Sequence, residues 1–380
     1  MGSSVKQIAI LGSTGSIGKQ TLDIVRAFPH RFHIVGLAAR ENIDLLRRQF
    51  SEFKPKFVYA GSDRAKTHLN NTQCEFLSLE DMASHPQVDT VVIATSGKSG
   101  LTPLLAALKA GKTIALANKE PLIMAGDIIT NEAKLNNAQI LPIDSEHSAI
   151  WQCLEGENRN IAKLILTASG GPFHAYSPAE LKDVTAEQAL RHPSWQMGRK
   201  VTIDSATLMN KGFEVIEAHL LFNVPFTHIN VLVHPQSIVH SMVEFIDGTI
   251  KAQLSYPDMR LPIQYALSYP ERIPNPELPR LIWDKIDKLT FTQPDFEAFP
   301  CLKLAIEAGK RGGTYPAVLC ATDEVAVELF LSHRINFVDI ASLVQQVITE
   351  HQVIDQPLLS EIMIADEWAR KKAIQLANRR

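Results

Sequence analysis

Residues 7–27 read QIAILGSTGSIGKQTLDIVRA, a short apolar run followed by a glycine-rich loop and an amphipathic segment. The apolar run is typical of a buried strand, and the segment after the loop has the apolar spacing of a helix. A strand, a tight glycine turn and a helix in this order form the opening unit of a doubly wound sheet. This stretch predicts an N-terminal α/β domain if the same alternation continues along the chain.

The alternation does continue through the first 150 residues. Apolar runs rich in Ile and Val alternate with amphipathic stretches such as LTPLLAALKAG at residues 101–111. Runs that are apolar at consecutive positions suit strands covered on both faces, as in a parallel sheet. We predict a Rossmann-like, doubly wound parallel sheet in residues 1–150, with strands at residues 7–11, 32–39, 56–60, 90–95, 113–117 and 139–143.

The pattern changes after residue 150. A predicted strand at 162–169 and one long helix at 205–222 are followed by two apolar runs that flank Asp247-Gly248, a strong hairpin signal. Prolines recur from residue 257 to residue 279, which predicts a connector lying along the surface. We predict a central α+β domain with antiparallel strands at 151–285, a linker at 286–310 and a small C-terminal helical bundle at 311–380.

The composition excludes several classes of protein. The 380 residues are 45% hydrophobic and 21% charged, with a formal net charge of −3 and no basic run, so we expect a soluble protein that does not bind nucleic acid. No apolar stretch approaches the roughly 20 residues that span a bilayer, so we expect no membrane insertion. The chain enters a strand soon after its start, so we expect no signal peptide. The four cysteines form no CxxC pair, which favours a reducing, cytoplasmic location.

The glycine loop predicts a nucleotide site. Gly12, Gly15 and Gly18 have the spacing GxxGxxG, a variant of the dinucleotide-binding pattern GxGxxG. Glycines let the backbone turn tightly and approach a pyrophosphate, which then lies at the positive end of the following helix. The alternative is a tight strand-to-helix turn without a ligand. The position of the loop at the first junction of a six-strand alternation favours a dinucleotide.

The end of the second predicted strand bears on the choice between NAD and NADP. NAD sites usually carry an acidic residue there, which binds the ribose hydroxyls. This chain has Arg40 followed by Glu41, and a cation at that point suits the 2′-phosphate of NADP. The adjacent Glu41 can be interpreted as a solvated loop charge, and NADP is the preferred cofactor.

Two carboxylates follow the sixth predicted strand. Asp144 and Glu146 are separated by Ser145, and residues 118–120 (Asn-Lys-Glu) follow the fifth strand at the same rim of the sheet. In an extended segment residues two apart face the same way, so the two acids should converge. A cation between them would relieve their repulsion, and oxygen ligands alone suit Mg²⁺ or Mn²⁺. The alternative is a pair that caps the following helix.

Two segments of the central domain carry polar groups suited to an anion. Ser169 is followed by two glycines at the end of a predicted strand, a shape that offers hydroxyl and backbone N–H groups. Residues 205–214 predict a hydroxyl-rich helix start with an Asn-Lys pair, which is one way to hold a phosphate. The alternative is a surface ion pair between Lys211 and Glu214, three residues apart on a helix.

The loop between these segments has the composition of a lid. Residues 191–200 read RHPSWQMGRK and combine an aromatic residue, a methionine and a glycine. Such a loop can close over a ligand. The alternative is that Trp195 packs inward.

Six stretches carry a resemblance to a known family. They are GSTGSIG (12–18), ALANKEPL (115–122), PIDSEHSAIWQCL (142–154), LTASGGPF (166–173), HPSWQMGRKVTIDSATLMNKGFEVIEAH (192–219) and VHPQSIVHSMVEF (233–245). Together they resemble 1-deoxy-D-xylulose 5-phosphate reductoisomerase over almost the whole chain, and the fifth stretch is the most specific. The resemblance implies conversion of 1-deoxy-D-xylulose 5-phosphate to the isoprenoid precursor 2-C-methyl-D-erythritol 4-phosphate. It also implies NADPH, Mg²⁺ or Mn²⁺, a homodimer formed by strands of the central domain, and inhibition by phosphonohydroxamates such as fosmidomycin.

The resemblance also assigns roles residue by residue. The implied metal ligands are Asp144, Glu146 and Glu214, which leaves Glu217 as a neighbour. The implied catalytic set is Lys119, Asp144, Glu146, Glu214 and His240. The implied substrate-binding set is Ser145, Glu146, Ser169, His192, Trp195, Ser205, Asn210, Lys211 and Glu214. With the glycine loop and Arg40, the cofactor set is Gly12, Thr14, Gly15, Ser16, Ile17, Arg40, Asn42, Asn118, Lys119, Glu120 and Gly198.

One departure and two rival functions stay open at this point. Members of the family often have Gly-Lys where this chain has Arg40-Glu41, so the side chain that meets the 2′-phosphate is undecided. One rival is a semialdehyde or homoserine-type dehydrogenase. An acylating semialdehyde enzyme would need a nucleophilic cysteine, whereas Cys153 lies in an apolar helix stripe. The other rival is a redox-sensing NADP(H)-binding protein, which would need an output element such as a helix-turn-helix.

Overall fold

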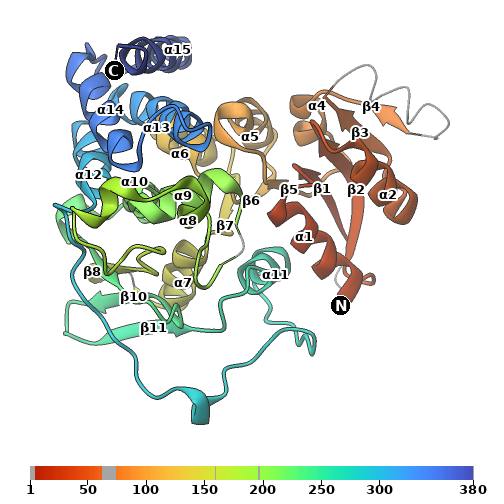
Figure 1. The fold of residues 1–380 in the computed structure, drawn as a ribbon. Coiled ribbons are helices and arrows are strands. Elements are labelled where there is room, and N and C mark those ends of the chain that lie inside the picture. The colour runs from red at the N-terminus through yellow and green to blue at the C-terminus, as the bar shows by residue number, and fades with distance from the viewer. Residues whose placement is uncertain (1–4, 62–73, 159, 196, 380) are drawn as a thin grey trace. The chain divides into compact units, whose positions relative to one another are not determined.

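The computed structural model describes residues 5–61, 74–158, 160–195 and 197–379 (Figure 1). The first four residues and Gln196 of the predicted lid therefore lie outside the described residues. The chain forms two compact units, each built from segments that are not contiguous in sequence, whereas the predicted domains are continuous. Unit 1 contains Met1–Pro121, Asp127–Ser148 and Asp258–Pro279, and unit 2 contains Leu122–Gly126, Ala149–Pro257 and Arg280–Arg380.

The described part of unit 1 contains a parallel sheet of seven strands in the order β4-β3-β2-β1-β5-β6-β7. The six predicted strands all form, and β4 adds a two-residue strand at one edge. Strand order runs outward from the centre in both directions, so it reverses between β1 and β5. The strands are β1 Lys6–Leu11, β2 Phe32–Ala39, β3 Phe57–Ala60, β4 Glu75–Phe76, β5 Thr90–Ile93, β6 Thr113–Leu116 and β7 Gln139–Pro142.

The central strands explain why the apolar runs are continuous. Residues 8–11 of β1 and 91–93 of β5 are all fully buried, which requires apolar side chains on both faces of the sheet. The connecting helices supply that cover. They are α1 Ser16–Ala27, α2 Ile43–Phe53, α4 Leu79–Ser84 and α5 Leu101–Lys109, with the 3₁₀ turn η1 at Gly97–Gly100; α6 Glu120–Leu135 and α7 Ser145–Leu154 have residues in both units.

The proline-rich segment 257–279 was predicted to be a surface connector, and this prediction is wrong. It contains helix α11, Arg260–Ser268, whose last seven residues are buried. This helix packs against α1, β6 and β7 of unit 1. Pro262 lies in the first turn, where a proline removes no helical hydrogen bond, so prolines around the helix do not prevent it from forming.

Unit 2 contains a mixed sheet in the order β11-β10-β8-β9. The strands are β8 Ile161–Ala168, β9 Ile229–Val233, β10 Val239–Phe245 and β11 Ile250–Leu254. The predicted hairpin forms between β10 and β11, and Gly248 adopts φ 84° in its turn. In contrast to the predicted antiparallel arrangement, β8 and β9 are parallel, because a helical crossover joins them.

The single helix predicted at 205–222 is broken in the structure. Helix α9 spans Arg199–Thr207, Leu208 has φ 61°, and α10 spans Met209–Phe222. The Thr207 hydroxyl accepts the Met209 N–H at 3.3 Å, which offers the backbone an alternative to the helical ladder. Because Leu208 is buried, the apolar spacing continues across the break and conceals it in the sequence.

The predicted C-terminal bundle is confirmed. Helix α13 packs against α12, α14 and α15, and most of its residues are buried. The remaining helical elements of unit 2 are η2 Glu180–Asp183, α8 Ala186–Ala189, η3 Phe226–His228, η4 Trp283–Lys285, α12 Pro300–Arg311, α13 Tyr315–Leu331, α14 Phe337–Glu350 and α15 Leu359–Ala377. Over the ranges that the structure describes, no helix combines the length and apolar character needed to cross a membrane.

Candidate active site

The glycine loop lies where the strand order of the unit 1 sheet reverses. Gly12 has φ 98°, and a Cβ atom on it would lie 2.3 Å from the backbone oxygen of Ala94, which directly follows β5. A Cβ atom on Gly18 would lie 2.5 Å from Ser13 Cα, so this glycine allows α1 to begin close to the loop. Ligands of doubly wound sheets bind at such reversal points. The dinucleotide interpretation therefore has the geometry it requires.

The loop is anchored by a pair that the sequence did not reveal. The Ser13 hydroxyl donates to Gln49 Oε1 at 2.8 Å, and Gln49 Nε2 donates to the Ser13 carbonyl at 2.9 Å. Both residues are buried. Gln49 lies on α2, far along the sequence, so only the folded chain brings it to the loop.

Three polar residues follow β2 and lead into α2. Arg40 and Glu41 are both exposed. Asn42 caps α2, since its Oδ1 accepts the Leu45 N–H at 3.1 Å. Arg40 therefore lies at the end of the strand, as the NADP interpretation requires, and Glu41 is an exposed loop charge.

A polar network follows β6 and reaches the end of β7. The Thr95 hydroxyl donates to Asn118 Oδ1 at 3.0 Å, and Asn118 Nδ2 donates to Glu120 Oε2 at 2.5 Å. Lys119 Nζ lies 2.8 Å from Asp144 Oδ2. The predicted meeting of these residues at one rim is confirmed, because β6 and β7 are parallel neighbours.

Asp144 and Glu146 converge as predicted, but the backbone between them is not extended as the prediction assumed. Helix α7 begins at Ser145, so Asp144 precedes it and Glu146 lies in its first turn. Asp144 Oδ1 accepts the Glu146 N–H at 3.2 Å, so the capping interpretation of Asp144 applies. Each residue nevertheless offers a carboxylate oxygen within 4.8 Å of the other. A cap and a cation site are therefore compatible at this position.

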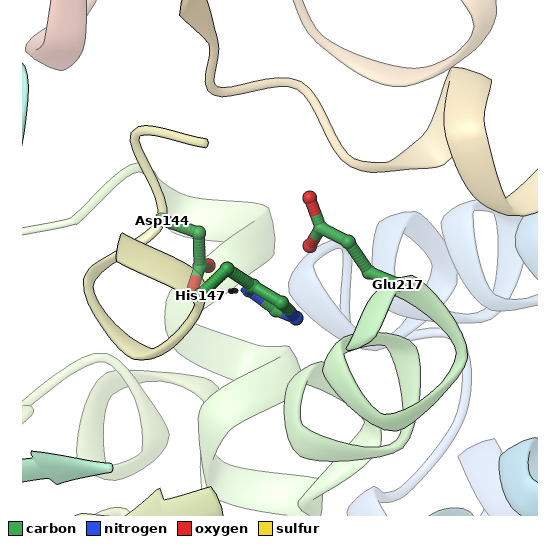
Figure 2. A group of neighbouring side chains, drawn as sticks. All are labelled: Asp144, His147 and Glu217. Carbon is green, nitrogen blue, oxygen red and sulfur yellow. Dashed lines mark hydrogen bonds and ion pairs between the residues drawn. The ribbon is translucent and has the colours of Figure 1, made fainter. Parts of the chain in front are cut away.

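His147 belongs to the same group and was missed in the sequence. It is fully buried, and its Nδ1 lies 3.0 Å from Asp144 Oδ1 (Figure 2). The available signal was its spacing of three residues from Asp144, which places both side chains on one side of a helical turn. Glu217, also drawn in Figure 2, belongs to α10 of unit 2.

Ser169 and His192 lie together in unit 2. Ser169 Oγ is 2.9 Å from His192 Nε2 and accepts the Gly171 N–H at 3.3 Å. His192 Nδ1 accepts the backbone N–H groups of Ser194 and Trp195 at 3.2 and 2.9 Å. A nitrogen that accepts carries no proton, so Nε2 carries it and donates to Ser169. The Ser169 hydroxyl then directs its own hydrogen elsewhere.

Burial lowers the pKa of His192 to about 4. Because the neutral form is favoured in the folded state, the associated stability is present above the ordinary pKa of 6.5 and is lost as pH falls from there towards 4. We expect ¹⁵N NMR of the imidazole to show the neutral, Nε2-protonated tautomer from pH 6 to 8, with His192→Gln used to assign the signal. A signal that titrates in that range would contradict the described hydrogen-bond arrangement.

Lys211 and Glu214 form a buried ion pair on α10, so the surface interpretation of this pair is wrong. Their side chains are 5% and 1% exposed. Asn210 Nδ2 also donates to the Glu214 carboxylate. The predicted hydroxyl-rich helix start is corrected as well, because Ser205 lies in the last turn of α9 while Asn210 and Lys211 begin α10.

The lid residues that the structure describes pack partly inward. The Trp195 ring lies 6.0 Å from the His240 ring, centroid to centroid, and His240 on β10 is buried. Gly198 is the N-cap of α9, and a Cβ atom there would meet nothing within 4 Å. The structure therefore gives no steric reason for a glycine at residue 198.

Three family models match successive parts of the chain. The 1-deoxy-D-xylulose 5-phosphate reductoisomerase model matches residues 8–126, that of its C-terminal domain matches residues 140–222, and the DXP reductoisomerase C-terminal domain matches residues 254–372. The chain belongs to the 1-deoxy-D-xylulose 5-phosphate reductoisomerase family. The resemblance seen in the sequence is confirmed.

Relatives of the same name cover nearly the whole chain. The reductoisomerase of Desulforamulus reducens is 52% identical, with 97% of this chain and 98% of that protein aligned. That of Pelotomaculum thermopropionicum is 50% identical, with 98% of each aligned. Among solved structures, DOX-P reductoisomerase in complex with NADPH, fosmidomycin and magnesium has a TM-score of 0.93 and 40% identity, covering 98% of both chains. The Zymomonas mobilis reductoisomerase in complex with NADPH has a TM-score of 0.91 and 39% identity, covering 98% of this chain and 99% of that one.

Proposed function

We propose that the chain converts 1-deoxy-D-xylulose 5-phosphate to 2-C-methyl-D-erythritol 4-phosphate, with NADPH as reductant and Mg²⁺ or Mn²⁺ as the metal ion. The observation that carries this proposal is the near-full-length similarity to reductoisomerases of that name. In the account favoured for the family, the carbon skeleton rearranges by a retro-aldol and aldol sequence, and the resulting aldehyde is reduced. When bound, the metal ion would supply a Lewis acid for the ketose oxygens, and NADPH would supply the hydride.

The cofactor set fits a dinucleotide at the reversal point of the sheet. The close approach of Gly12 to Ala94 leaves room for backbone but not for a side chain. The N-cap of α1 is Gly15, which provides no capping side chain, so the helix start is suited to a phosphate. The same proposal gives cofactor contacts to Thr14, Gly15, Ser16, Ile17, Asn42, Asn118, Lys119, Glu120 and Gly198.

The metal set consists of carboxylates only, as Mg²⁺ prefers. Asp144 and Glu146 converge in unit 1, and we propose that Glu214 of unit 2 is the third ligand. Lys119, which is paired with Asp144, holds that carboxylate in place beside the reacting end of the substrate. Ser145 contributes at the same end, since its hydroxyl donates to Glu146 Oε2 at 2.7 Å.

The phosphate set is proposed to be Ser169, Ser205, Asn210 and Lys211. Ser169 accepts hydrogen bonds from His192 and Gly171, so its own hydroxyl hydrogen can point to an anion. Lys211 supplies a buried positive charge. Binding energy from a phosphate held away from the reacting carbons can orient the substrate. It can also close the lid, which is the loop that contains Trp195, the neighbour of His240.

The direct test is to incubate the purified chain with 1-deoxy-D-xylulose 5-phosphate, NADPH and Mg²⁺, and to identify the product. We expect NADPH oxidation to depend on both the metal ion and the substrate. We also expect fosmidomycin to inhibit it. Consumption of NADPH without formation of 2-C-methyl-D-erythritol 4-phosphate would contradict the proposal.

The choice of cofactor gives a separate prediction. Arg40→Ala should raise the KM for NADPH roughly tenfold and leave weak use of NADH nearly unchanged. Because Arg40 is exposed, the lost contact should be worth about 1.5 kcal/mol, the lower end of the range for hydrogen bonds to charged groups. Steady-state kinetics with both cofactors would check this. Equal losses for NADPH and NADH would show that Arg40 does not contact the 2′-phosphate.

We also propose a homodimer and a cytoplasmic location. β11 lies at the edge of its sheet, and the hairpin that ends in it exposes Ile246 and Ile250 by 72% and 51%. An exposed apolar edge strand favours association with another copy. Among the described residues none of the four cysteines forms a disulfide and three of them are buried, as expected in a reducing compartment.

A further inference from the structure

The ammonium group of Lys200 lies where three helices of unit 2 meet. Lys200 is in the first turn of α9, and its Nζ lies 2.7 Å from Asp204 Oδ2 on the same helix. The same atom lies 2.8 Å from Asp323 Oδ2 on α13. It also lies 4.7 Å from the centroid of the Phe213 ring on α10. One cation therefore contacts α9, α10 and the C-terminal bundle at the same time.

This arrangement is not explained by helix stability alone. A positive charge in the first turn of a helix opposes the helix dipole. The side chains of Asp204 and Asp323 are 2% and 0% exposed, and buried carboxylates require a cation close by. Burial, with Asp323 and Asp204 nearby, also raises the pKa of the Cys301 thiol on α12, so both carboxylates lie close to this buried group. A buried ion group adds little net stability but restricts how the helices that carry it can pack.

The helices that Lys200 joins carry residues that we propose bind the substrate phosphate. Ser205 lies in the last turn of α9, and Lys211 lies in the first turn of α10, two residues before Phe213. A Cβ atom on Gly171 would lie 2.8 Å from the Ser205 backbone oxygen, so the loop that follows Ser169 rests directly on the end of α9. A shift of α9 would therefore change the position of Ser205 and of the Ser169 loop relative to Lys211.

We propose that Lys200, held by Asp323, is a positioning residue for substrate phosphate binding, because it fixes α9 against α10 and α13. This inference rests on the proposed assignment of Ser169, Ser205 and Lys211 to the phosphate. Lys200 does not touch the substrate in this scheme. It acts by fixing the distances between the residues that bind the phosphate, Ser169, Ser205 and Lys211.

The test compares Lys200→Met, Lys200→Arg and Asp323→Asn. Met keeps the aliphatic length of lysine beside Phe213 and removes the charge. Lys200→Met and Asp323→Asn should raise the KM for 1-deoxy-D-xylulose 5-phosphate by about 10- to 100-fold, the scale of a misplacement of about 1 Å. The KM for NADPH should rise much less than the KM for substrate, since all of its proposed contacts except Gly198 lie in unit 1. Lys200→Arg, which keeps the charge, should retain most of the wild-type affinity for substrate.

Arg370 on α15 provides a matched control. Its side chain is 26% exposed, against 25% for Lys200, and it pairs with the buried Asp366 on its own helix at 3.0 Å. Its second partner, Glu324, is the residue next to Asp323 on α13. Arg370→Met should therefore lower the melting temperature about as much as Lys200→Met does and leave both KM values unchanged.

The outcomes separate this inference from the proposed function. Wild type without turnover would contradict the function, and a normal substrate KM in Lys211→Ala would contradict the phosphate assignment. If Lys211→Ala raises the substrate KM but Lys200→Met and Asp323→Asn do not, the positioning role is wrong. It is also wrong if Arg370→Met raises the substrate KM equally, or if the NADPH KM rises in step. Should Lys200→Met fail to fold, Asp323→Asn and Lys200→Arg still decide the question.

Discussion

Replacing Asp144 by Asn should lower kcat by about 10²–10³ and raise the Mg²⁺ concentration needed for half-maximal activity. Asn keeps the shape of the side chain and can still accept the Glu146 N–H at the start of α7. It removes the negative charge beside Lys119 Nζ and, in the proposed site, a metal ligand. The loss falls on kcat because the missing interaction acts on oxygen charge that develops in the transition state. Initial rates of NADPH oxidation across a Mg²⁺ titration would measure both effects.

Asp258 in the same unit offers a matched control for this variant. Its Oδ1 accepts the Arg260 N–H at 2.9 Å at the start of α11, and its Oδ2 lies 2.6 Å from Arg260 Nη2. The Asp258 and Asp144 side chains are 14% and 13% exposed. Both substitutions remove a carboxylate charge that is paired with a cation at the start of a helix, and both leave an amide oxygen that can still accept the backbone N–H. Only Asp144→Asn should alter the dependence on Mg²⁺.

A second comparison tests the third ligand. Glu214 and Glu217 are equally buried on α10 and differ by one turn of the helix. Under the proposal Glu214→Gln impairs metal-dependent turnover and Glu217→Gln does so much less. The metal role is wrong if chelator-treated wild type turns over normally, or if the two variants are equally impaired.

Lys211→Ala should weaken binding of the phosphorylated substrate by roughly 2–5 kcal/mol, the scale for truncating one partner of a buried charge pair. Lys211 is only 4% exposed, so water cannot replace its charge at the proposed phosphate site. The substitution also takes a cation away from the buried Glu214 carboxylate, which adds to the loss. Substrate KM and kcat would measure the effect, and NADPH affinity should be nearly unaffected.

A substrate without phosphate separates the two parts of this loss. Wild type should strongly prefer 1-deoxy-D-xylulose 5-phosphate to 1-deoxy-D-xylulose, and Lys211→Ala should lose most of that preference. If the variant loses affinity for both substrates equally, Lys211 acts on Glu214 and not on the phosphate. A normal KM and kcat with the phosphorylated substrate would mean that the phosphate site has been misplaced.

Local patterns were sufficient for much of the fold and for the identity of the polar groups. The apolar runs of the central strands are long because both faces of β1 and β5 are covered, and this property is visible residue by residue. The close approach of Gly12 to Ala94 needs a glycine, so the loop is also visible in the sequence. Asp247-Gly248 specified its hairpin by turn chemistry alone.

Other features were decided by contacts between distant segments. The sequence placed residues 257–279 on the surface, but α11 is buried because α1, β6 and β7 provide an apolar surface for it. Asp144 and Glu146 were expected to converge through an extended backbone, yet they do so across the start of α7. The break between α9 and α10 at Leu208 is concealed because Leu208 is itself buried, so the apolar spacing of a single helix continues across it.

What the sequence by itself determined is therefore the parallel sheet, the glycine loop, the helical bundle and the list of acids, hydroxyls and lysines that carry the chemistry. These depend on backbone preferences and on periodicities of two and 3.6 residues, which a short window contains. Only the tertiary structure decided that Lys211 and Glu214 are a buried pair, that His147 meets Asp144, and that Lys200 meets Asp323. Burial and charge pairing depend on which segments pack together, and a local sequence pattern does not indicate which distant residue a side chain will contact.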